Sequence, residues 1–369
     1  NRTLALRYGV TQFPAIVIEN VETGAIQPIY PATEQQIVTG ILVVTGVERK
    51  KAYVLTGHGE RSTTRNVSTN EIGTEGLDLA IEGLLRDNYA VQSLNLLQLR
   101  DVPTDAAVII VAGPTQDLDD NERAAIDRYL TRGGRMLFLL DPNTPFAFAN
   151  LIAEWGIALG TLPIADAGSS VAGQPLTPLL QRANGQYITV PLSGVEIARE
   201  IDVVFFPGVT PVGPILGPED IPPQVTYLPL AVTTNASWLE TDPSNPRPDP
   251  GIEQAGPFPA VAAIEACAKI TAAPTQCRSG LPVTKIIVFG DSDFVKNQFF
   301  TSRDNADFFL NSVNYLTDDY ELISIRPKVF PVRQMTLTLN ERSFIQWSSW
   351  LLPPALMLIL GVVVWWRRR

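Results

Sequence analysis

Residues 106–141 read AAVIIVAGPTQDLDDNERAAIDRYLTRGGRMLFLLD. Two continuous apolar runs, at 106–111 and 136–140, flank a segment in which apolar residues recur at helical spacing, and Gly133-Gly134 ends that segment. Apolar strands that alternate with an amphipathic helix are typical of a parallel sheet covered on both faces. This stretch therefore predicts an α/β fold.

The same alternation extends in both directions. We expect a strand at 52–55, a helix at 77–88 and a strand at 91–96 upstream, and a strand at 285–289 with a helix at 306–316 downstream. The sequence thus predicts a doubly wound, mostly parallel sheet, Rossmann-like or flavodoxin-like.

Prolines interrupt this pattern. Residues 207–282 contain 15 of the 30 prolines, and proline removes backbone donors from a sheet. We expect an irregular Pro-rich insertion there, with edge strands.

The predicted organisation in chain order is a β region at 1–46, the first part of the α/β domain at 47–160, the insertion at 161–283, the completion of the α/β domain at 284–320, a juxtamembrane segment at 321–343, a transmembrane helix at 344–366 and a tail at 367–369.

Composition excludes some classes of function. The chain has 369 residues, a net charge of −10 and 45% hydrophobic residues, which suits two or three globular domains. An acidic chain repels phosphate backbones, and no stripe of Lys and Arg interleaved with aromatic residues is present. We expect no nucleic-acid partner.

The membrane prediction rests on the C-terminal residues. No charged residue occurs between Ser343 and Trp366, and three arginines follow. At about 1.5 Å per residue this stretch is longer than the ~30 Å hydrocarbon layer. Tryptophans at both ends suit the two interfaces, and the arginines favour the cytoplasmic side. We therefore place the bulk of the chain outside the cytoplasm, and expect Pro353 and Pro354 to mark the helix start or a kink.

Residues 1–46 predict a β-hairpin. The Tyr8-Gly9-Val10 segment followed by Pro14 resembles the C-terminal half of a thioredoxin-like domain, where the proline is usually cis. No Cys-x-x-Cys motif is present, so redox catalysis is not expected. Because the sequence starts at Asn1 and carries no signal peptide, we expect an export signal or anchor upstream.

Candidate site residues follow two predicted strands. Gly57-His58-Gly59-Glu60 comes after the strand at 52–55, at the edge where α/β proteins bind ligands. As a dinucleotide loop the segment is defective, because Ser62 stands in the third glycine position. His58 and Glu60 are a candidate acid/base pair or ligand-site lining, and the alternative is that they stabilise their own turn.

The second candidate is Asp291-Ser292-Asp293. Ser292 resembles a nucleophile elbow, although Phe294 stands where a small residue is needed. An extracytoplasmic hydrolase or carbohydrate-active protein that uses His58 and Ser292 remains the alternative. Two aspartates alone supply too few ligands for a metal, and we predict no metal and no cofactor. Cys267 and Cys277 are candidates for a disulfide on an oxidising side of the membrane.

Five segments in the same order resemble one family. They are YVLTGHGE at 53–60, TNASWLET at 234–241, VFGDSDF at 288–294, NADFFLNSVNYL at 305–316 and IRPK at 325–328. Together with the closing apolar helix they are similar to the auxiliary component of gliding-motility-type (GldG-like) ABC transport systems. Members of that family resemble glutamine-amidotransferase-like α/β domains that lack the catalytic cysteine.

The resemblance implies a non-catalytic subunit anchored in the bacterial cytoplasmic membrane. Its bulk would be periplasmic, and its partners would be the lipid bilayer, an ABC permease and a cytoplasmic ATPase, in a homo- or hetero-oligomer. Accessory and substrate-binding-like roles both fit, and the family leaves open whether the system serves motility, secretion or the envelope.

Overall fold

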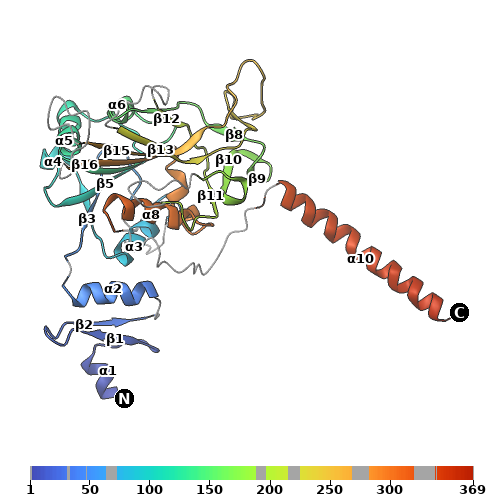
Figure 1. Cartoon of the computed structure of the whole chain (residues 1–369), viewed down its shortest axis with the longest axis horizontal. Helices are drawn as coiled ribbons and strands as arrows, with labels where there is room; N and C mark the ends of the chain where they lie inside the picture. The colour runs from blue at the N-terminus through green and yellow to red at the C-terminus, as the bar shows by residue number, and fades with distance from the viewer. Residues whose placement is uncertain are drawn as a thin grey trace.

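The computed structural model describes residues 2–30, 34–46, 48–63, 73–187, 197–214, 225–267, 282–319, 337 and 339–368. A seven-stranded sheet lies at the centre, in the order β13-β15-β16-β6-β5-β3-β4 (Figure 1). Its strands are β3 (Lys51–Leu55), β4 (Ala90–Leu94), β5 (Ala106–Ala112), β6 (Arg135–Leu139), β13 (Val225–Val232), β15 (Pro259–Cys267) and β16 (Val283–Phe289).

The five neighbouring strands from β16 to β4 are parallel, and β15 is antiparallel to both of its neighbours. Taken in chain order, these five strands lie as 2-1-3-4-5 across the sheet. That is the flavodoxin-like order, whose switch point lies between the first and third strands. The predicted doubly wound, mostly parallel sheet is confirmed, and its switch point lies between β3 and β5.

Helices cover both faces of this sheet. Because side chains alternate along a strand, Val54 of β3 packs into one buried cluster and Leu55 into the other. The first cluster includes α3 (Asp78–Arg86) and α8 (Asn305–Leu316), and the second includes α5 (Asp120–Thr131) and α6 (Phe146–Ala153). Two four-residue helices, α4 (Leu96–Leu99) and α7 (Asn297–Phe300), complete the domain.

The segment predicted as a Pro-rich insertion is divided differently from the expectation. Part of it forms small sheets from β8 (Ile164–Asp166), β9 (Ser170–Val171), β10 (Gln174–Gln181), β11 (Val203–Phe205), β12 (Val212–Pro214) and β14 (Ser237–Leu239), and β12 pairs with β7 (Ile157–Leu159). However, β13 and β15 join the central sheet. Pro259 is the first residue of β15 and the rest of that strand lacks proline, so its donors can pair on both sides. Pro229 lies in β13, an edge strand, beside a register shift.

The N-terminal region forms a small unit. It contains α1 (Arg2–Arg7) and the predicted hairpin, with β1 (Ile16–Glu19) antiparallel to β2 (Ile26–Ile29), and the Phe13–Pro14 peptide bond is cis. A helix that the sequence did not predict, α2 (Glu34–Val44), packs on the hairpin. The two are so close at Gly40 that a Cβ there would lie 2.7 Å from Ile29 Cδ1. The thioredoxin-like assignment of this region stays a prediction.

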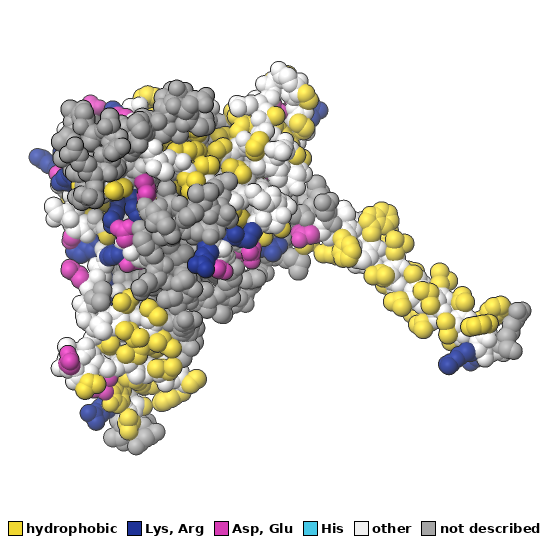
Figure 2. All heavy atoms as spheres, viewed as in Figure 1, with side chains coloured by type: hydrophobic (Ala, Val, Ile, Leu, Met, Phe, Trp, Pro, Cys, Tyr) yellow, Lys and Arg dark blue, Asp and Glu magenta, His cyan; other side chains and the backbone are white. Residues whose placement is uncertain are grey.

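The last helix, α10 (Leu339–Arg367), extends away from the domain (Figure 1). Pro353 and Pro354 lie inside it, so they do not mark its start. Residues Glu341–Arg367 are long and apolar enough to cross a membrane, and none of their most apolar window is buried. Figure 2 shows apolar side chains along this helix.

Candidate functional site

His58 lies between two carboxylates. Its Nδ1 is 3.0 Å from Oε1 of Glu60, and its Nε2 is 3.0 Å from Oε2 of Glu122. The imidazole is 3% exposed, and the Phe148 ring packs against it edge-on. The hydrogen bond with Glu60, followed by that with Glu122, raises the pKa of His58 to about 9 against the opposing effect of burial. His58 is therefore an imidazolium at neutral pH, and both ring nitrogens donate.

Glu60 is held in its charged form. Burial pushes the pKa of Glu60 upward, but hydrogen bonds from the His58 ring and from the His58 backbone N–H outweigh it and lower the pKa. The backbone N–H of His58 lies 2.7 Å from Glu60 Oε2. One carboxylate thus fixes both the backbone and the ring of the same residue.

Glu122 is positioned by the start of α5. The side chain of Asp119 accepts hydrogen bonds from the backbone of Asn121 and Glu122, and the Glu122 side chain accepts one from the Asp119 N–H, which forms a capping box. The same Glu122 oxygen that accepts the Asp119 N–H lies 3.0 Å from His58 Nε2. A helix cap therefore presents a fixed acceptor to the loop after β3.

The loops after β3 and β5 are tied together directly. The backbone N–H groups of Thr115 and Gln116 donate to the carbonyl of His58 at 2.8 and 2.9 Å, and the Arg61 N–H donates to Ala112. Gly59 has φ +73°, and a Cβ there would lie 2.0 Å from Thr115 Oγ1. The two loops of the chain therefore fill the space at the switch point themselves.

Ser292 belongs to a second polar cluster, after β16. Its Oγ donates to Asp141 Oδ2 at 2.6 Å, and its backbone N–H donates to Asp141 Oδ1 at 2.7 Å. Arg61 reaches across from the loop after β3, with Nε donating to Ser292 Oγ at 2.9 Å and Nη2 paired with Asp293. Lys296 also contacts Asp293, at 3.1 Å.

Asp291 is fully buried beside this cluster. Burial, and then the charges of Asp141 and Asp293, raise the pKa of Asp291 well above its usual range. Its Oδ1 accepts the Asp293 N–H at 2.5 Å, while Oδ2 has no hydrogen-bond partner.

The structure places all of the predicted ligand-site residues at one edge of the sheet, in two clusters. They are Gly57, His58, Gly59 and Glu60 after β3, and Asp291, Ser292 and Asp293 after β16. His58 and Ser292 do not form a catalytic pair, because carboxylates hold both ring nitrogens of His58, and Asp141 and Arg61 hold the Ser292 hydroxyl. That these residues line a ligand site stays a prediction.

Several residues of these clusters were not predicted from the sequence. Glu122 could have been found from the D-x-x-E spacing of Asp119 and Glu122, which is a capping-box pattern. Asp141 lies two residues after the end of β6, as Asp291 lies two residues after the end of β16, and the ends of parallel strands meet at one edge. Arg61 had no such signal, because only the tertiary fold shows where its side chain reaches.

The described residues line a pocket of about 350 Å³ elsewhere, at the opposite edge of the sheet. Its wall consists of residues that precede or begin β5 and β6, namely Pro103, Thr104, Ala106, Ala107, Tyr129, Arg132, Gly133, Gly134 and Arg135.

Within the described part of the chain, no group of His, Cys, Asp and Glu has the arrangement of a metal site. Cys267 ends β15, and Cys277 lies outside the described residues, so the disulfide stays a prediction.

A family model described as "ABC-type uncharacterized transport system", which covers the auxiliary component of such systems, matches residues 49–312. The chain belongs to this family. The match contains the whole carboxyl edge described above, from Gly57 to Asp293. No curated protein matches the chain.

Two solved structures are similar in outline. The mmIFT52 N-terminal domain aligns with a TM-score of 0.46 at 16% identity, over 72% of this chain and 97% of that one. The exo-beta-1,4-mannosidase Op5Man5 from Opitutaceae bacterium strain TAV5 aligns with a TM-score of 0.34 at 12% identity, over 77% of this chain and 38% of that one. At these scores neither similarity bears on function.

Proposed function

We propose that this chain is a non-catalytic, membrane-anchored accessory subunit of an ABC-type transporter, with its α/β domain outside the cytoplasm. The family supports the transport role. The observation that carries the non-catalytic part is the mutual pairing at the carboxyl edge: both nitrogens of His58 and the hydroxyl of Ser292 are bound by the chain's own charged groups.

The anchor in this proposal is α10. The candidate span Glu341–Arg367 has 27 residues and extends about 40 Å at the helical rise, more than the ~30 Å hydrocarbon layer. Trp350 is 72% and Met357 75% exposed, and such a surface suits lipid or permease helices rather than water. Arg367 and Arg368 at the end favour a cytoplasmic C-terminus.

Mild-detergent affinity purification of the full-length protein, followed by mass spectrometry, tests the proposal. We expect an ABC permease and its ATPase in stoichiometric amounts, and the substrates of that permease would tell whether motility, export or envelope maintenance is served. Leu358→Arg should lower recovery of the permease, because a charge near the bilayer centre costs about 3 kcal/mol or more. Leu97→Arg, on exposed α4, is the matched control. Recovery of neither subunit with the parent chain would contradict the proposal.

The sidedness can be tested separately. Every lysine of the chain precedes residue 341, and the tail contains only arginines. A membrane-impermeant amine reagent applied to intact spheroplasts should therefore label the chain only if the α/β domain is extracytoplasmic. Labelling that requires lysis would overturn that orientation.

A further inference from the structure

A rigid loop projects from the small sheet of β8 and β14. It runs from Thr241 to Glu253 and forms the gold-coloured projection above β8 in Figure 1. It contains four prolines, at 243, 246, 248 and 250. Its base is closed, because the Leu239 N–H donates to the carbonyl of Gln254 at 3.0 Å. A compact loop with adjoining ends is a frequent carrier of function.

Glu240 precedes the loop, and its side chain accepts hydrogen bonds from the loop backbone. The carboxylate is 2% exposed and accepts hydrogen bonds from Trp238 Nε1 at 2.9 Å, from the Asp242 N–H at 2.7 Å and from the Arg247 N–H at 3.0 Å. Two distant points of the loop backbone are thus fixed to one buried side chain.

Glu253, at the other end of the loop, also accepts hydrogen bonds from the loop backbone. Its Oε1 accepts the N–H and hydroxyl of Thr241 at 2.9 and 3.0 Å, and its Oε2 accepts the Asp249 N–H at 2.9 Å. The Asp242 side chain holds Ser244, at 3.2 Å from its N–H. These bonds leave the loop little conformational freedom to lose on binding.

The remaining backbone donors are also used internally. Asn245 donates to the carbonyl of Asp242, and Ile252 and Glu253 both donate to the carbonyl of Asp249. Prolines have no N–H. Apart from Gly251, each backbone N–H between Thr241 and Glu253 therefore has an acceptor within the loop or at its base. The loop backbone offers acceptors to a partner, and almost no donors.

The outer surface of the loop is apolar, and most of the charged side chains around it are acidic. Ile252 is 78% exposed, and Pro243, Pro248 and Pro250 are exposed as well. The charged side chains of the loop are Asp242, Asp249 and Glu253 against Arg247. A complementary surface supplies an apolar groove and positively charged or N–H donors around it.

We propose that this loop is the docking element for the permease, and that it inserts Ile252 and its prolines into an aromatic-lined extracytoplasmic groove with Arg, Lys or Trp donors at the rim. Aromatic grooves are the common recognition mode for proline-rich segments. The rigidity set by Glu240 and Glu253 lowers the entropic cost of binding. This inference rests on the proposed function and adds the contact surface and its chemistry.

The test uses the full-length chain in its own membrane. A photo-crosslinking amino acid replaces Ile252, and in a second variant it replaces Leu97, which is 59% exposed on α4. We expect the Ile252 position to crosslink to the extracytoplasmic part of the permease and the Leu97 position not to. Ile252→Ser should lower recovery of the permease about tenfold, and Leu97→Ser should leave it unchanged.

The outcomes separate the two proposals. If the parent chain recovers the permease and Ile252→Ser recovers as much, the loop inference is overturned while the proposed function stands. If the parent recovers no permease, the proposed function fails and the loop inference falls with it. If both positions crosslink equally, the contact is unspecific and the inference is overturned. A replacement of all four prolines by Ala, which retains Glu240 and Glu253, should also weaken recovery, because it removes both the inserted prolines and the rigidity that they confer. Unchanged recovery would overturn the inference.

Discussion

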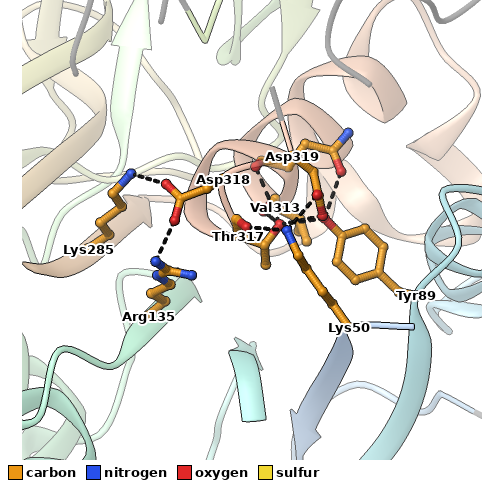
Figure 3. A network of polar contacts seen from close by, with 9 residues as sticks. Lys50, Tyr89, Arg135, Lys285, Val313, Thr317, Asp318 and Asp319 are labelled. Atoms are coloured by element: carbon orange, nitrogen blue, oxygen red, sulfur yellow. Dashed lines mark hydrogen bonds and ion pairs between the residues drawn. The ribbon is translucent and has the colours of Figure 1, made fainter. Parts of the chain in front are cut away.

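Lys50 and Asp319 form an ion pair at 2.5 Å, although they lie 269 positions apart in the sequence. Lys50 precedes β3, and Asp319 follows α8, so the pair joins the two ends of the α/β domain (Figure 3). Lys50 also donates to the carbonyl of Thr317 at 2.6 Å, at the C-terminal end of α8, where a cation is favourable. The connections toward the N-terminal hairpin and toward α10 thus leave the domain from one place.

Tyr89 is the buried member of this network. It is 1% exposed, and its hydroxyl lies 2.9 Å from Asn314 Oδ1, 2.5 Å from Thr317 Oγ1 and 3.1 Å from Asp319 Oδ2. Tyr89→Phe should lower the free energy of unfolding by about 1–3 kcal/mol, because it leaves buried polar groups without a partner. Urea unfolding of the full chain in detergent measures this.

Tyr53→Phe provides the matched control for Tyr89. The Tyr53 hydroxyl donates to Asp105 at 3.0 Å, and the Asp105 side chain is 49% exposed, so water can replace the lost bond. We expect a change of less than about 1 kcal/mol. Equal losses in the two variants would show that burial of the network contributes nothing.

His58 predicts a loss of stability at alkaline pH. Its pKa is raised from 6.5 to about 9 in the folded chain, so the stabilisation is complete below pH 6.5 and is lost as the pH rises through 9. The loss attributable to His58 should approach about 3 kcal/mol over that window. His58 is the only histidine. His58→Gln should therefore be less stable than the parent at pH 6.5 and should lose less between pH 6.5 and 9. Parallel curves for the two proteins would refute the imidazolium assignment.

Asp291 predicts a second pH effect, at lower pH. Because its folded pKa is raised well above the usual range, the unfolded chain releases this proton first, and stability falls as the pH rises above about 4, by at most about 1.4 kcal/mol per pH unit. Asp291→Asn retains the acceptor for the Asp293 N–H and removes this slope. It should stabilise the chain relative to the parent as the pH rises above about 4. Destabilisation throughout that range would indicate that Asp291 is charged.

Gly113 tests how closely the two clusters pack. It has φ +61°, and a Cβ there would lie 2.7 Å from Ser292 Oγ and 3.3 Å from Arg61 Nε. Gly113→Ala should lower the free energy of unfolding by the backbone strain, about 1–2 kcal/mol, and also by the energy needed to displace Ser292. Gly185 has φ +67° with nothing within 4 Å, so Gly185→Ala should cost the strain alone. Comparison of the two denaturation midpoints isolates the packing contribution, and equal shifts would mean that Ser292 moves freely.

The sequence alone determined the fold class, because apolar strands and amphipathic helices alternate in periods that depend only on local chemistry. It also placed α10, since a long run without charges is a local property, and it located both polar loops because each follows a strand directly. The hairpin at β1 and β2 was predicted from its turn for the same reason.

Only the tertiary structure decided the partners of those local elements. The strand order placed Arg61 beside Ser292, and the start of α5 brought Glu122 to His58, which changed a candidate acid/base pair into an imidazolium held by two carboxylates. It also placed β15 inside the sheet rather than in an insertion. The physical reason is the same in each case: periodicity and turn chemistry act over a few residues, whereas strand pairing and side-chain contacts join segments that only the folded chain brings together.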